Sequence, residues 1–197
     1  MGRSLIMLAM LGWLLLPRAP AFAQSTAEEH SGVYLRMSVG LTSMQVEHAS
    51  DADSELGGAL SFALGYFVLP NLALSLDVFG ANAYKFHVPD PSEEGTTLEL
   101  DARTLGAGVS LTYYFPFEFY LSVAPGVAWL RIGIEDGPTH LSQADFGLNV
   151  IAGKEWWIGG SWALGAGVQL VYVLADIESA GIDATWSLGV LFTVTRN

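Results

Sequence analysis

The chain has 197 residues, of which 51% are hydrophobic, no cysteine, and a formal charge of −12 at pH 7. This length suits one domain, and the lack of cysteine excludes disulfides and thiol-based catalytic or metal sites. The shortage of Lys and Arg excludes nucleic acid as a partner, because binding phosphates requires clustered cations.

The first predicted element is a secretory signal peptide over residues 1–23. Arg3 supplies the basic n-region, Leu5 to Leu16 form an apolar h-region, and Ala21-Phe22-Ala23 is a cleavage site of the A-x-A type. A retained membrane anchor fits less well, since about 12 apolar residues are too few to cross a hydrocarbon core of roughly 30 Å. We therefore predict an exported chain whose mature part is one domain over residues 24–197.

Export lowers the charge further. Removal of residues 1–23 takes away two of the 8 basic residues and none of the 20 acidic ones, so 8 − 2 = 6 basic and 20 acidic residues give a net charge of −14. No cofactor is expected for this domain.

The next elements are β-strands. Residues 59–80 (ALSFALGYFVLPNLALSLDVFG) are apolar enough for a transmembrane helix, but large side chains occupy every second position, as at Leu60, Phe62 and Leu64. This period of two is typical of strands. Pro70-Asn71 separates the two halves, which predicts two strands joined by a tight turn.

The same alternation continues along the chain and predicts eight strands, over residues 31–46, 57–69, 72–85, 98–114, 119–134, 143–157, 162–175 and 184–195. In the strand over 98–114 the apolar positions change phase, which we interpret as a bulge near residues 103–105. An even number of strands permits closure into an all-β, eight-stranded, antiparallel up-and-down barrel.

The two faces of these strands indicate a transmembrane β-barrel. The second face carries Gly, Ala and Ser with scattered charges, which suits the narrow lumen of an eight-stranded barrel better than a surface in water. An Arg on the lipid-facing side at the bilayer midplane would cost about 2 to 4 kcal/mol. We therefore predict a polar cluster inside the lumen, made of Arg36, Asp77, Glu99, Asp101, Arg103, Asp145 and Gln169.

The connections and the aromatic residues predict the orientation. Short turns at 70–71, 116–118 and 159–161 alternate with longer loops at 47–56, 86–97, 135–142 and 176–183. In outer-membrane barrels the short turns are periplasmic and the long loops extracellular. Aromatic side chains cluster beside the short turns, and we predict an interfacial girdle of Tyr113, Phe115, Phe117, Phe119, Trp156, Trp157 and Trp162.

The four long loops contain 12 of the 20 acidic residues and neither Lys nor Arg. Solvated loops are the simplest interpretation. A second is that the carboxylates collect divalent cations that bridge to anionic lipopolysaccharide. Asp51-x-Asp53-x-Glu55 resembles the start of a calcium loop, but Leu56 replaces the required Gly, and we predict no metal site there.

With these features the sequence resembles the small eight-stranded outer-membrane proteins of Gram-negative bacteria, such as the outer-membrane protein A transmembrane domain and outer-membrane protein X. The stretch GKEWWIGGSWALGAGVQL (153–170) is typical of the group, whereas the last residue, Asn197, stands where the group usually ends in an aromatic residue. The resemblance implies the outer membrane, insertion by the barrel-assembly machinery, contact with lipid and lipopolysaccharide, and a monomer.

For function, the resemblance favours a non-enzymatic barrel that contributes to envelope integrity or surface interactions through its acidic loops. A narrow channel or a carrier of small hydrophobic molecules, as in the outer-membrane protein W group, is the alternative. A lipid A deacylase is a weaker one, because His140 and Ser142 are spaced to share a strand face, with Glu155 or Asp145 to orient the imidazole.

Overall fold

The structure is a computed structural model that describes residues 31–46, 55–89, 97–134, 139–177 and 182–196. Eight long strands and one short one account for almost all of these residues. Their bounds are β1 (Val33–Val46), β2 (Glu55–Leu69), β3 (Leu72–Pro89), β4 (Thr97–Tyr114), β5 (Phe119–Ile134), β6 (Thr139–Leu141), β7 (Asp145–Gly159), β8 (Trp162–Ile177) and β9 (Ile182–Arg196).

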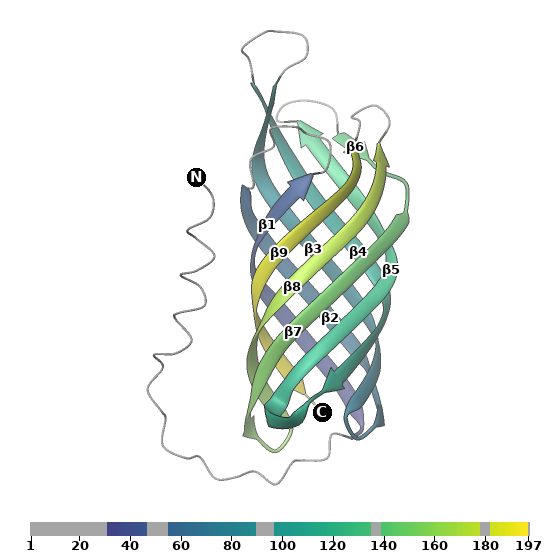
Figure 1. Cartoon of the computed structure of the whole chain (residues 1–197), viewed down its shortest axis with the longest axis vertical. Helices are drawn as coiled ribbons and strands as arrows, with labels where there is room; N and C mark the ends of the chain where they lie inside the picture. Colours follow the sequence, from purple (N-terminus) through teal and green to yellow (C-terminus); the bar gives the residue numbers. More distant parts are fainter. Residues whose placement is uncertain (1–30, 47–54, 90–96, 135–138, 178–181, 197) are drawn as a thin grey trace, which may run out of the picture.

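The long strands form a closed, eight-stranded antiparallel barrel in which each strand pairs with its neighbours in the chain (Figure 1). The first and last strands close it, in a register that runs from Leu35 opposite Arg196 to Val46 opposite Thr185. The predicted fold class is confirmed. The predicted signal peptide and most of the acidic loop residues lie outside the described residues.

The strands extend further at the long-loop end than the sequence predicts. The β3–β4 pairing continues to Pro89 opposite Thr97, within a segment predicted as a loop. The short strand β6 also lies in a predicted loop and pairs with the end of β5, where Arg131 is opposite Leu141. That loop prediction is wrong because backbone groups that precede the start of β7 still find partners on β5.

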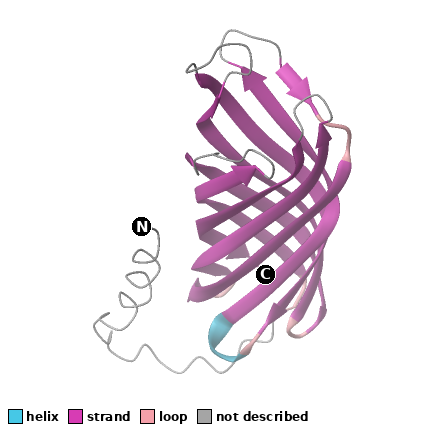
Figure 2. Ribbon diagram, turned by 45° about the horizontal axis from the view of Figure 1, so that its top comes forward, coloured by secondary structure: helices cyan, strands magenta, loops and turns pink. Residues whose placement is uncertain are grey.

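The three short turns lie at one end of the barrel, where β1 begins and β9 ends (Figure 1). The turn between β4 and β5 is the 3-10 segment η2 (Pro116–Glu118), cyan in Figure 2. Phe117 and Glu118 both have left-handed backbones there, with φ of 67° and 63°. This end is the periplasmic one by the rule that short turns face the periplasm.

The barrel is apolar outside and mixed inside. Large hydrophobic side chains on the outer face are exposed, among them Leu76 (68%) and Val39 (62%), whereas Arg36 and Asp77 are buried inside. A soluble barrel would show the reverse order, so the sidedness predicted from the sequence is confirmed. Among the described residues, no helix has the length and apolar character needed to cross a membrane.

Candidate functional site

Polar side chains cross the middle of the lumen around the carboxylate of Asp77 on β3. Ser61 donates a hydrogen bond of 2.9 Å to Asp77 Oδ1, and Asn149, from the opposite wall, donates one of 3.2 Å to Oδ2. Gln169 Nε2 in turn donates to Asn149 Oδ1 over 2.9 Å. The network therefore ties together β2, β3, β7 and β8 across the barrel.

Arg36 of β1 supplies the positive charge beside this network. Its Nη2 lies 3.8 Å from Asp77 Oδ2 and donates a hydrogen bond of 3.0 Å to Ser122 of β5. Its guanidinium carbon is 6.0 Å from the ring centre of Tyr34 and 5.1 Å from that of Tyr120. Both side chains of the ion pair are fully buried, so each charge depends on the other and on these hydrogen bonds.

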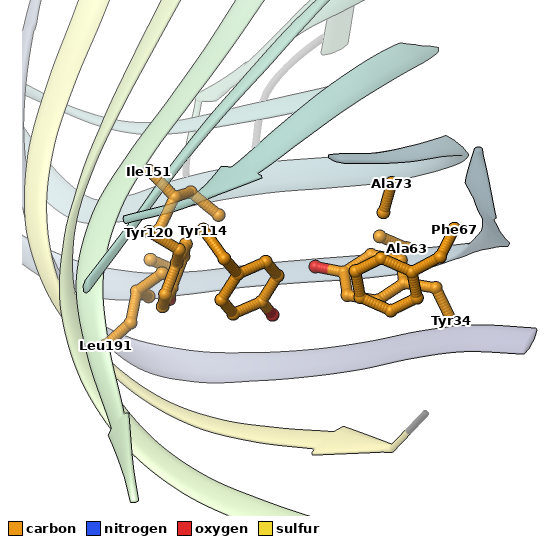
Figure 3. Packing of buried hydrophobic residues seen from close by; sticks show 9 residues of the cluster. Tyr34, Ala63, Phe67, Ala73, Tyr114, Tyr120, Ile151 and Leu191 are labelled. Carbon is orange, nitrogen blue, oxygen red and sulfur yellow. The ribbon is translucent and has the colours of Figure 1, made fainter. Parts of the chain in front are cut away.

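A second cluster occupies the lumen nearer the short turns. Tyr114 of β4 donates a 3.0 Å hydrogen bond through the lumen to Glu155 Oε2 of β7, and Thr195 of β9 donates to Oε1. Figure 3 shows Tyr114 between Tyr120 and Phe67, with ring centres 5.8 and 5.9 Å away. Aromatic rings and one bound carboxylate thus fill this section of the lumen.

The lumen section on the long-loop side is filled by apolar side chains. Phe79 and Leu130 have no exposed surface, and Met44 is 1% exposed. The space beside Phe79 exists because residue 106 is Gly: a Cβ there would lie 2.5 Å from the Phe79 ring and 3.0 Å from Ala128 Cβ. Side chains from all parts of the wall therefore pack the interior, as expected for eight strands.

The structure brings together three of the seven side chains predicted for the lumenal cluster, namely Arg36, Asp77 and Gln169. Asp145 is on the inner face, opposite the buried Ala128, but at the start of β7 and apart from the others. Its Oδ1 accepts a hydrogen bond of 2.6 Å from the next backbone amide. The side chain of Glu99 lies outside the part of the chain that the structure describes.

The lumenal placement of Asp101 and Arg103 is wrong. Their side chains are 49% and 54% exposed and share the outer face of β4, where Arg103 Nη2 lies 3.9 Å from Asp101 Oδ2. The predicted bulge at 103–105 is absent: burial alternates without a change of phase from Ala102 through Thr104 to Gly106. Outward charges are tolerated here because they lie near the loop end of the strand, beyond the apolar band.

Six of the seven predicted girdle residues lie on the outer surface at the periplasmic end, from 42% exposed at Phe119 to 82% at Phe117. The six are Tyr113, Phe115, Phe117, Phe119, Trp156 and Trp162. The prediction for the seventh, Trp157, is wrong. Trp157 is opposite the buried Ala163 and so has the inward phase of β7, and its indole N–H donates to Glu118 Oε2 over 2.9 Å. Adjacent strand residues face opposite sides, so Trp156 and Trp157 cannot both face lipid.

A second set of outward aromatic residues, at the long-loop end, was not predicted. Its members share the outward phase of β5, β7, β8 and β9: Trp129, Phe146, Tyr172 and Trp186. Tyr172 and Trp186 are directly opposite one another, and Phe146 is opposite Val127, two residues before Trp129. Aromatic residues at both edges of an apolar band are typical of transmembrane barrels.

Sequence reasoning also missed several lumenal residues. Asn149, Ser61 and Ser122 bind the Asp77–Arg36 network, and Tyr114 binds Glu155. The alternation along each strand could have predicted that these side chains face the lumen. Asn149 and Glu155, for example, are an even number of residues apart on one strand and therefore share a face.

The hydroxyl of Ser142 has a structural role. Its Oγ accepts a 2.8 Å hydrogen bond from the amide of Leu130 and donates one of 2.9 Å to the carbonyl of Gln143. Glu155, the suggested orienting carboxylate, is near the opposite end of β7 and is held by Tyr114 and Thr195. The His140 side chain is outside the described part of the chain.

A closed eight-stranded barrel with an apolar exterior and a filled lumen defines a small transmembrane β-barrel. The family described as "Outer membrane protein beta-barrel domain" matches residues 8–192, so the chain belongs to this outer-membrane family. The protein therefore resides in the outer membrane. None of the curated proteins compared with the sequence matches it.

Solved structures show the same fold. Neisserial surface protein A is 18% identical with a TM-score of 0.57, and the match covers 86% of this chain and 99% of that one. The outer membrane protein OprG from Pseudomonas aeruginosa is 15% identical with a TM-score of 0.50, covering 87% and 99%. At these identities the likeness establishes the fold.

Proposed function

We propose that the protein is a non-enzymatic outer-membrane scaffold that contributes to envelope integrity or to surface interactions. The observation that carries this proposal is the filled lumen. Arg36, Tyr34 and Tyr114 are each at most 2% exposed, and the Arg36–Asp77 and Tyr114–Glu155 contacts join non-adjacent strands through the lumen at two levels. A rigid barrel whose interior is occupied by its own side chains leaves function to its loops and outer surface.

The acidic loops are the proposed interaction surface, with lipopolysaccharide as partner directly or through divalent cations. The support for this proposal comes from the sequence. Residues 47–54 and 90–96, outside the described residues, contain six carboxylates and neither Lys nor Arg. Both stretches connect strand ends at the long-loop end of the barrel, and carboxylates on one side of the membrane suit cation-mediated contacts between neighbouring envelope molecules.

Envelope permeability tests this role. Deletion of the gene should increase uptake of a hydrophobic fluorescent probe and sensitivity to a chelator of divalent cations, and the intact chain should restore both. A variant with Asn or Gln at the six carboxylates of these two loops should insert normally and restore neither. Unchanged permeability after deletion would contradict the envelope role.

Conductance separates this function from the channel alternative. The purified barrel in a planar bilayer should give no unitary current steps, because Arg36, Asp77 and the tyrosines obstruct the lumen, while a general porin in the same set-up conducts. Reproducible steps from the purified chain would establish a channel instead.

A further inference from the structure

The cations on the outer face at the periplasmic end lie in one sector of the barrel wall. Residues 24–197 contain six Lys and Arg residues, and two of these, Lys154 of β7 and Arg196 of β9, lie on the outer face near the short turns. The described outward residues of β1 to β5 at this end include neither Lys nor Arg. Because β8 lies between β7 and β9, both cations belong to the same three-stranded sector (Figure 1).

Both cations lie within the aromatic girdle. Lys154 is directly opposite Phe119 of β5, and its Nζ lies 4.5 Å from the centre of that ring. Arg196 is directly opposite Trp162 of β8, and its guanidinium carbon lies 5.5 Å from the centre of the Trp162 ring. Girdle aromatic residues mark the boundary between lipid and water, so the two cations are at the depth of the phospholipid headgroups.

Carboxylates of the protein do not neutralise these two cations within the part of the chain that the structure describes. Lys154 Nζ donates a hydrogen bond of 2.9 Å to the uncharged carbonyl of Phe117, and its remaining N–H donors stay available. Arg196 forms no ion pair and no side-chain hydrogen bond with any described residue. The carboxylate of Glu118 in the neighbouring turn accepts a hydrogen bond from the indole of Trp157.

The spacing of the two cations suits two phosphates better than one. Lys154 is opposite Ala166 of β8, and Arg196 is opposite Trp162, four residues away on the same strand. Two strand spacings of about 4.8 Å and four rises of about 3.3 Å place the Cα atoms of the cations about 16 Å apart. Lys154 also leans toward Phe119, on the side of β7 away from β9, so the two charges do not converge on one point.

Aromatic and aliphatic side chains cover the wall between the cations. Trp156 of β7 is opposite Leu164 of β8, and Leu164 is opposite Val194 of β9. Trp156 and Trp162 are 52% and 45% exposed. Indole rings at this depth contact the boundary between headgroup and acyl chain, and the aliphatic side chains contact the acyl chains themselves.

We propose that Lys154 and Arg196 bind a phospholipid of the cardiolipin class, which has two phosphodiester groups in one headgroup, in the inner leaflet of the outer membrane. Each cation binds one phosphate through charge-assisted hydrogen bonds, as basic residues beside a membrane do with anionic headgroups. The acyl chains lie against Trp156, Leu164 and Val194. This inference goes beyond the proposed envelope role, because it concerns the end of the barrel opposite the acidic loops.

Thermal unfolding of the refolded full chain in lipid vesicles tests the proposal. The midpoint, read from the band shift between folded and heat-unfolded chain on a gel, is compared in phosphatidylcholine alone and with either cardiolipin or phosphatidylglycerol at matched charge. Cardiolipin should raise the midpoint by at least about 3 °C, since a ligand that binds only the folded state stabilises it. Phosphatidylglycerol, which has a single phosphate, should give less than half of this increase.

Substitutions locate the site. Arg196→Gln should lose at least half of the increase with cardiolipin, and the Lys154→Gln/Arg196→Gln double variant nearly all of it. Lys154→Arg, which retains the positive charge, should keep the increase. Arg131→Gln, which removes an outward cation at the long-loop end, is the matched control and should also keep it. Each variant is compared with its own midpoint in phosphatidylcholine, because Lys154 also donates to the β4–β5 turn.

Three results would overturn the proposal. A full increase in the double variant would show that the lipid binds elsewhere on the barrel. An equal loss in Arg131→Gln and Arg196→Gln would show a general effect of net charge. An equal increase with phosphatidylglycerol would show that paired phosphates are not recognised.

Discussion

At the scale of single residues, the charge balance of the lumen depends on Arg36. Removing this cation leaves Asp77 buried without its counter-charge, although Ser61 and Asn149 still donate to it. Breaking a buried ion pair costs about 3 to 5 kcal/mol, because the remaining charge stays desolvated. The neighbours Ser122, Tyr34 and Tyr120 carry no positive charge that could replace the lost guanidinium.

Arg36→Leu should therefore lower the free energy of unfolding in detergent micelles by about 3 kcal/mol or more. Ser38→Ala, two residues along the same face, is the matched control: its buried hydroxyl lacks a partner in the described residues, so its loss should change stability by less than about 1 kcal/mol. Urea titration followed by tryptophan fluorescence measures both.

The double variant Arg36→Leu/Asp77→Leu tests the cause. Removing both charges should recover much of the stability lost in Arg36→Leu, because no unpaired ion remains. Equal stability of Arg36→Leu and Ser38→Ala would contradict the ion-pair interpretation.

At the scale of elements, the strands were predictable and their contacts across the lumen were not. Alternation is a local property, so it places Asp77 and Gln169 on the inner face correctly. Continued back from Leu105, it also places Asp101 and Arg103 on the outer face, and the prediction failed because it assumed a change of phase near residues 103–105 that the strand does not make. The partners of Arg36 and Glu155 depend on the register around the whole barrel, which no local pattern encodes.

The β4–β5 turn shows how local strain is held by neighbouring strands. Phe117 and Glu118 adopt left-handed backbones that non-glycine residues rarely populate. Lys154 donates a hydrogen bond of 2.9 Å to the Phe117 carbonyl, and Trp157 donates to Glu118. Both donors belong to β7, so the turn depends on a strand that follows it in the chain.

Replacing Phe117 tests this strain. Phe117→Asn should be more stable than Phe117→Val by about 1 kcal/mol, because Asn tolerates a positive φ and a β-branched side chain does not. Both variants lose the aromatic ring, so the comparison isolates the backbone. The same two substitutions at Phe115, whose φ is −84°, should not reproduce this advantage of Asn. Equal unfolding free energies for the two Phe117 variants would show that the turn is unstrained.

At the scale of the whole molecule, the cost of placing a charge on the outer surface should depend on its depth in the bilayer. Val109 and Leu105 share the outer face of β4 and are almost equally exposed, at 51% and 53%. Four and eight residues from Tyr113, they lie about 10 and 20 Å above it, so Val109 is near the midplane and Leu105 near the outer edge.

Arginine at these two positions should therefore have unequal effects. Val109→Arg should destabilise the barrel in vesicles by about 2 to 4 kcal/mol, whereas Leu105→Arg should cost about 0 to 1 kcal/mol. Reversible unfolding from vesicles in guanidinium chloride measures the difference. In detergent micelles, which adapt their shape to the protein, the two values should converge. Equal costs in vesicles would contradict the assigned membrane position.

The seam between β1 and β9 has a consequence for biogenesis. Strand β1 is synthesised first, but its second neighbour in the barrel is β9, which is synthesised last. The pairing of β1 therefore stays incomplete until the whole chain is available. Until then its unpaired backbone groups can recruit foreign strands, a route to aggregation, and contacts of such long sequence separation form slowly. A chain with this connectivity must be escorted across the periplasm as an unclosed polypeptide, and its closure is the step that makes insertion final.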